Sequence, residues 1–139
     1  MYWILVLTLA FDLAAVKSEP NLEKRSELAL EHANVALDAA RDDYNAGDVG
    51  KSQSELEEVC DSVDLAYEAL ADTGKDPHKD SKFFKRAELR INELMRRLES
   101  LAPGMSGVDR GTLDNVRARI SAVHDKLLTG IMTRSSKKK

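Results

Sequence analysis

The chain has few of the residues that cross-link, kink or stack a small protein. Its 139 residues include one cysteine, three prolines and seven glycines, and 5% are aromatic. A single cysteine excludes an intramolecular disulfide. Scarce aromatics disfavour a β-sandwich or barrel, and scarce proline and glycine leave long uninterrupted segments. Ala, Leu, Glu, Lys and Arg dominate instead, which favours long helices in one soluble domain.

Sequence patterns for common chemistries are also missing. The sequence contains no His-Glu-x-x-His, no Cys-x-x-Cys-His and no glycine-rich phosphate loop after a strand. Metal sites in helical bundles use Glu-x-x-His pairs, but Ala29 stands three residues before His32, and Ser121 stands three before His124. We therefore expect no catalytic residue, no metal site and no cofactor, and we interpret the chain as a protein that is not an enzyme.

Charge is unevenly distributed. The net charge is −3, yet four positive residues follow Thr133, so the rest of the chain carries −7; these four are Arg134, Lys137, Lys138 and Lys139. An acidic body argues against nucleic-acid binding, which requires a basic face. We expect residues 133–139 to be a disordered basic tail, and a weak contact of this tail with a membrane surface is an open alternative.

The N-terminus begins with an apolar stretch. Residues 2–11 are nearly all apolar, and Asp12 interrupts them. A bilayer span needs about 20 apolar residues, so this stretch is too short, but its length fits a secretory signal peptide with Ala14 and Ala15 near a cleavage site. No basic residue precedes it. We expect residues 1–19 to be a signal-peptide-like segment and linker of an exported, periplasmic protein; an N-terminal membrane anchor, or a segment packed on the domain, are the alternatives.

Four later segments show the 3.6-residue apolar period of amphipathic helices. The expected helices cover residues 21–45, residues 49–72, a third segment that Asp80 or Ser81 caps, and a fourth after the turn at 102–107, with Asp109 as its candidate cap. Short connections make successive helices antiparallel. We expect a single all-α domain over residues 20–132, in which four long antiparallel helices form two helical hairpins, either as an up-down bundle or as an open stack.

The apolar stripes differ in size. The first helix presents small residues and the third presents large ones, so we expect a close helix crossing and large-against-small packing. The small stripe is Ala29, Ala33, Ala36 and Ala40, with Tyr44 at its end; the large stripe is Phe84, Ile91, Leu94 and Leu98. The stripe of the second helix is Ser52, Leu56, Val59, Val63, Ala66 and Leu70, and that of the fourth is Leu113, Val116, Ile120, Val123, Leu127 and Ile131.

The turn between the first two helices carries the most specific pattern. Gly47 is suited to the left-handed conformation after a helix, Asp48 can cap the next helix, and Tyr44, Ala40 and Ser52 flank the crossing. Together these residues resemble the inter-helix turn of tetratricopeptide repeats, over residues 36–60 only. The resemblance implies a tetratricopeptide-like hairpin stack that recognises another protein.

Three further features each have a functional and a purely structural interpretation. Cys60 is expected to be a buried small apolar residue, since no base or second cysteine supports reactivity. Glu57, Asp61 and Asp64 share one helix face, which would bind a cation weakly or remain a solvated acidic surface. His124 is a formal haem-ligand candidate that adjoins the core stripe.

These observations predict a non-catalytic helical protein-interaction or scaffold module that is exported and binds an unidentified protein partner. The alternative is a small ligand, metal or haem carrier on a four-helix bundle. No small-molecule substrate is evident from the residues.

Overall fold

The computed structural model describes residues 13–133, and within them the regular structure is helical, without a β-strand. The all-α prediction is therefore confirmed. The apolar stretch at 2–11 and the basic residues after Thr133 lie outside the described residues, so the signal-peptide and tail assignments stay predictions. Within the described part, no helix is long and apolar enough to cross a membrane.

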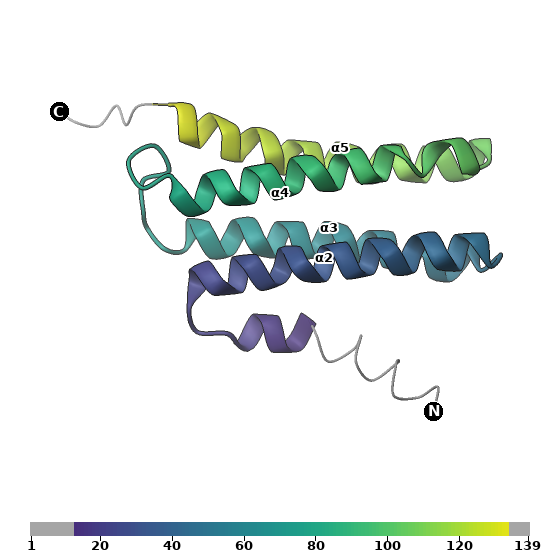
Figure 1. Cartoon of the computed structure of the whole chain (residues 1–139), viewed down its shortest axis with the longest axis horizontal. Coiled ribbons are helices and arrows are strands. Elements are labelled where there is room, and N and C mark those ends of the chain that lie inside the picture. The colour runs from purple at the N-terminus through teal and green to yellow at the C-terminus, as the bar shows by residue number, and fades with distance from the viewer. Residues whose placement is uncertain (1–12, 134–139) are drawn as a thin grey trace.

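The first hairpin consists of α2 (Leu22–Asn45) and α3 (Val49–Ala71). Both helices begin at a side-chain cap. The Asn21 side chain accepts a 3.0 Å hydrogen bond from the Lys24 backbone N–H, and Asp48 accepts one of 3.1 Å from Lys51. Gly47 has a φ of +90°, the left-handed region that glycine adopts readily. This short turn returns α3 alongside α2 (Figure 1).

The second hairpin consists of α4 (Lys82–Glu99), a 3₁₀ turn (Ala102–Gly104) and α5 (Gly107–Met132). The last helix begins before the predicted cap. Ser106 occupies the cap position, and Asp109 lies in the first turn, where its carboxylate accepts a 2.9 Å hydrogen bond from the Ser106 hydroxyl. A carboxylate in the first turn stabilises a helix through the macrodipole. Asp109 therefore stabilises the start of α5 as a first-turn residue and not as the N-cap residue.

The predicted apolar stripes are confirmed as the core. Their central residues are buried, with exposed fractions between 0 and 6%. The core also contains two residues from outside the four helices, Met105 and Val16; the latter belongs to a short helical segment at residues 13–18. The buried stripe residues are Ala29, Ala33, Ala36, Ala40, Leu56, Val59, Val63, Leu70, Phe84, Ile91, Leu94, Leu98, Leu113, Val116, Ile120, Val123 and Leu127.

The hairpins form two layers, with α4 and α5 on one side and α2 and α3 on the other (Figure 1). The most extensive helix contact is between α2 and α3, and across the layers α2 contacts α4 while α3 contacts α5. Residue numbers rise together along both cross-layer contacts, so α2 runs parallel to α4 and α3 parallel to α5. The cross-layer ion pairs include Glu27–Arg86 and Asp38–Arg97 between α2 and α4, and Asp61–Arg119 and Asp64–Arg119 between α3 and α5. Between α3 and α5, Cys60 Sγ also lies 3.9 Å from the Val116 carbonyl oxygen.

The two hairpins carry opposite net charge. Residues 22–71 contain 13 acidic and 4 basic side chains, a net charge of −9, whereas residues 82–132 contain 10 basic and 6 acidic side chains, a net charge of +4. Opposite charges at the layer boundary attract each other. Charge therefore complements apolar burial in holding one hairpin on the other.

Candidate functional site

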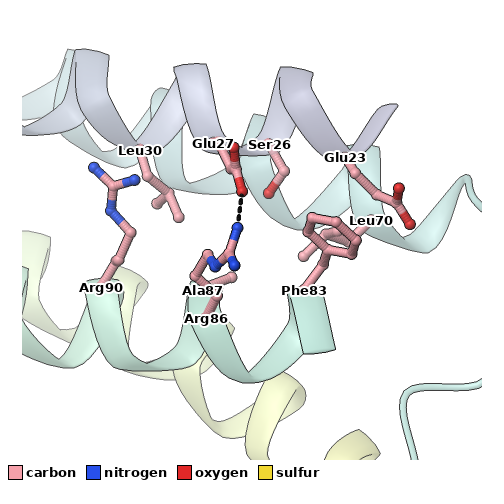
Figure 2. A pocket seen from close by; sticks show the side chains of 9 residues that line it. All are labelled: Glu23, Ser26, Glu27, Leu30, Leu70, Phe83, Arg86, Ala87 and Arg90. Atoms are coloured by element: carbon pink, nitrogen blue, oxygen red, sulfur yellow. Dashed lines mark hydrogen bonds and ion pairs between the residues drawn. The ribbon is translucent and has the colours of Figure 1, made fainter. Parts of the chain in front are cut away.

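A small cleft lies between α2 and α4, where the two layers meet (Figure 2). Its volume is about 200 Å³, including space open to solvent. Apolar side chains form one part of the lining and charged side chains form the other. The apolar residues are Leu30, Leu70, Phe83 and Ala87; the polar residues are Glu23, Ser26, Glu27, Arg86 and Arg90.

The charged side chains of the cleft differ in whether they have an ion-pair partner. Glu27 Oε2 and Arg86 Nη1 are 2.6 Å apart and join the two helices across the cleft (Figure 2). Glu23 accepts a 2.6 Å hydrogen bond from Lys75 Nζ, and this contact raises the pKa of Lys75. Arg90 forms no hydrogen bond or ion pair with any residue in the range 13–133. The cleft therefore offers one uncompensated guanidinium beside an apolar surface.

The ring of Phe83 is held by cations on its own helix. Lys82 Nζ and Arg86 Cζ each lie 5.4 Å from the ring centroid, a cation–π distance. Arg86 thus contacts both Phe83 and Glu27, which fixes the relative position of the apolar and charged parts of the lining.

The predicted turn residues are brought together at the opposite end of α2. Ala40 and Ser52 are both 1% exposed, and the Ser52 hydroxyl donates a 2.8 Å hydrogen bond to the Ala40 carbonyl. The Tyr44 hydroxyl donates to Asp109 at 2.9 Å and accepts from the Ser106 backbone N–H at 3.1 Å. Sequence reasoning placed Tyr44 on the core stripe but missed this link, because its partner is 65 residues away.

An acidic group beside that turn is electrostatically perturbed. Burial raises the pKa of Glu55 from 4.5 to about 7, together with the hydrogen bond that its protonated carboxyl donates to Asp43 and the negative charge of Asp43; Asp48 adds to the rise and Lys51 opposes it. Glu55 Oε1 is buried and has no hydrogen-bond partner among the described residues. The Glu55 carboxyl is therefore partly protonated near neutral pH.

Two histidines join helices within their hairpins. His32 Nε2 lies 2.6 Å from Glu58 Oε2, and His124 Nε2 lies 2.6 Å from Glu88 Oε2. In the haem-ligand candidate His124, this nitrogen is therefore engaged by a carboxylate. Sequence reasoning found neither pair, since helix periodicity does not specify which residues of two helices are opposite each other.

The acidic face of α3 and its cysteine have structural partners. Arg119 lies 3.0 Å from Asp64 and 3.7 Å from Asp61. Cys60 is buried, as predicted, and its burial raises the thiol pKa to about 11, so the nucleophilic thiolate is scarce at neutral pH. Within residues 13–133, no cluster of three or more His, Cys, Asp or Glu side chains is placed to hold a metal ion.

Comparison with known proteins found no matching family model, curated protein or solved structure.

Proposed function

We propose that the chain is a non-catalytic protein-interaction module whose α2–α4 cleft receives a side chain of a partner protein. The observation that carries this proposal is Arg90, an unpaired guanidinium beside the apolar lining of the cleft. Protein interfaces combine an apolar centre with a polar rim, and arginine is enriched among the residues that dominate their binding energy.

The cleft also limits the chemistry of the partner. The cleft volume of about 200 Å³ includes space open to solvent, so at most one side chain of a partner enters it, and a whole peptide does not fit. A carboxylate next to that side chain would pair with Arg90. Leu30, Leu70, Phe83 and Ala87 supply the apolar contact beside it. The expected partner therefore presents an apolar residue next to an acidic one.

We further propose that the two hairpins form a tetratricopeptide-like stack rather than an up-down bundle. In an up-down bundle, adjacent helices are antiparallel neighbours in chain order. Here α2 lies along α4 and α3 lies along α5 in the same direction, and the contact of α3 with α4 is less extensive than either. A second hairpin that repeats the first by translation gives this arrangement.

Export is the compartment that we propose, on the basis of the apolar stretch at 2–11. Cleavage after Ala15 would retain Val16, which packs in the core with an exposed fraction of 5%. N-terminal sequencing of the mature protein tests this assignment. A mature chain that begins near residue 16 supports export, whereas a chain that retains Met1 contradicts cleavage and favours the anchor.

Partner capture with matched variants tests the function. The wild-type protein, Arg90→Glu and Arg96→Glu are each used to recover proteins from an envelope fraction. Arg96 is exposed on the same helix and outside the cleft lining, so its variant carries the same charge change. We expect wild type and Arg96→Glu to recover the same partner, and Arg90→Glu to bind it at least about tenfold more weakly, as loss of a buried charge contact predicts.

Two results of this capture would contradict the proposal. Equal recovery by Arg90→Glu would exclude the cleft as the binding site. Repeated recovery of no partner by a folded, monomeric protein would exclude the interaction role itself. The alternative of a metal or haem carrier is tested separately, because a colourless, metal-free preparation of untagged protein would rule it out.

A further inference from the structure

Lysines are concentrated at the end of the molecule where α3 leads into α4. An open hollow of about 810 Å³, including space open to solvent, lies there and is lined by Lys75, Lys79, Asp80, Ser81, Lys82, Phe83 and Lys85. Lys75 is paired with Glu23. Lys79, Lys82 and Lys85 are exposed and form no ion pair with any residue that the structure describes. Three uncompensated ammonium groups therefore share one surface with a single lining carboxylate.

The end of α5 is fixed beside this loop. His78 Nδ1 lies 2.8 Å from the Ile131 carbonyl oxygen. Gly130 fits closely against Pro77, since a Cβ at Gly130 would lie 3.2 Å from two Pro77 side-chain carbons. The last turn of α5 therefore lies beside the loop that carries Lys75 and Lys79.

The last turns of α5, whose Ile131 carbonyl contacts His78 of this loop, also expose apolar side chains. Met132 is 71% exposed and Leu128 is 38% exposed on the last turns of α5. A bilayer surface binds both kinds of side chain, because anionic headgroups attract lysines and exposed apolar side chains enter the headgroup boundary. A nucleic acid would use the cations alone.

We propose that this end docks onto anionic phospholipid, with Lys79, Lys82 and Lys85 facing the lipid phosphates and Met132 contacting the acyl boundary. The surface shares Phe83 with the α2–α4 cleft but does not use Arg90. The inference therefore stands or fails independently of the proposed function.

Vesicle co-sedimentation of the full chain tests this docking. Vesicles of phosphatidylcholine with phosphatidylglycerol are compared with vesicles of phosphatidylcholine alone, so that uncharged partitioning of the apolar stretch at 2–11 is subtracted. We expect binding to the anionic vesicles to exceed binding to the neutral ones, and to weaken as salt concentration rises.

A charge-matched pair of variants locates the surface. Lys79→Gln/Lys82→Gln/Lys85→Gln removes three charges from the lysine-rich end, and each basic residue near a membrane contributes enough that we expect about 100-fold weaker anionic-vesicle binding. Arg41→Gln/Lys51→Gln/Arg96→Gln removes three charges elsewhere and should retain binding. Circular dichroism and a thermal melt of both variants verify that they are folded.

Three results would overturn the docking proposal. Equal binding to neutral and anionic vesicles would exclude recognition of the negative headgroup charge. Loss of binding on deletion of residues 134–139, with no effect of the triple lysine variant, would assign the contact to the tail alone. Binding to duplex DNA or RNA without binding to anionic vesicles would show that the lysines recognise a nucleic acid instead.

Discussion

The two hairpins fill the shared core with side chains of different size. In α2 four alanines, with Leu30 and Leu37 beside them, form the buried stripe, and α2 makes its most extensive contact with α3. In α4 the stripe consists of large residues, and the contact with α5 is less extensive. Small side chains let helix backbones approach closely, whereas large ones fill a wider space. The first hairpin is therefore the more closely packed unit, and the second supplies bulk to the shared core.

Charge and polar contacts extend this comparison. The first hairpin has a net charge of −9 and the second of +4. Each hairpin also joins its two helices by a histidine–carboxylate pair, but the His32 side chain is 1% exposed and the His124 side chain 14%. The acidic hairpin thus buries more of its polar groups, and the basic hairpin supplies most of the cations that line the cleft and the lysine-rich end.

The largest expected effect comes from removing bulk from the second hairpin. Leu98→Ala deletes a side chain that is 0% exposed and leaves a cavity that rigid helices fill poorly, so we expect a loss of about 3 kcal/mol in the free energy of unfolding. Urea denaturation measures this loss. Met95→Ala, at a partly buried position of the same helix, serves as the control, and an equal loss in both variants would contradict the assigned role of Leu98.

Adding bulk to the first hairpin should be the next most damaging change. Ala33 is 0% exposed, so Ala33→Leu forces α2 away from its neighbours, and we expect a loss of about 2 kcal/mol. Ala87→Leu makes the same change in the second hairpin beside the cleft, where space is available, and should cost less. Thermal or urea unfolding compares the two, and a larger loss at Ala87 would reverse the packing comparison.

The stability of the protein should depend on pH through Glu55 of the acidic hairpin and not through a carboxyl group of the basic hairpin. Because the pKa of Glu55 rises from 4.5 to about 7 on folding, the folded state holds a proton that the unfolded state releases, and stability falls as pH rises from 4.5 to 7. The carboxyl is partly exposed, so we expect a fall of roughly 1 kcal/mol rather than the full shift. Glu55→Gln should flatten this dependence in pH-dependent urea titrations, whereas Glu93→Gln in the second hairpin should retain it.

The smallest expected effect concerns the close crossing itself. Ser52→Ala removes the buried hydroxyl that donates to the Ala40 carbonyl, which costs about 1 kcal/mol. The higher helix propensity of alanine offsets about half of that cost, so we expect a net loss of about 0.5 kcal/mol. Ser54→Ala, at an exposed position of α3, should be neutral or stabilising in the same urea denaturation. If Ser52→Ala were more stable than Ser54→Ala, the Ser52–Ala40 hydrogen bond would not stabilise the fold.

Local signals made the helices predictable. Asn21, Gly47 and Asp48 mark helix ends through caps and a left-handed glycine, and the 3.6-residue period identified the buried stripes. The start of α5 was misplaced because Gly107 has a low helix propensity and Asp109 resembles a cap. The compensating contacts of Asp109 with Tyr44 and Ser106 involve tertiary structure.

The candidate sites depend on which helices are neighbours, which periodicity does not specify. The cleft exists because α2 lies along α4, and that placement decides which cations of α4 meet a carboxylate: among residues 13–133, Arg86 pairs with Glu27 and Arg90 has no ion-pair partner. The lysine-rich end requires the last turn of α5 to lie beside Pro77. The charge difference between hairpins, by contrast, follows from the sequence once the hairpin boundaries are known.

Proximity cross-linking tests the parallel stacking of α2 on α4 most directly. In a Cys60→Ala background, Glu27→Cys/Arg86→Cys and Asp38→Cys/Arg97→Cys place cysteines at observed ion pairs, while Glu27→Cys/Arg97→Cys moves one cysteine about 16 Å along α4. We predict that a short bismaleimide cross-links the first two variants efficiently and the third poorly. Efficient cross-linking of the third variant, with little in the first two, would contradict the stacked arrangement.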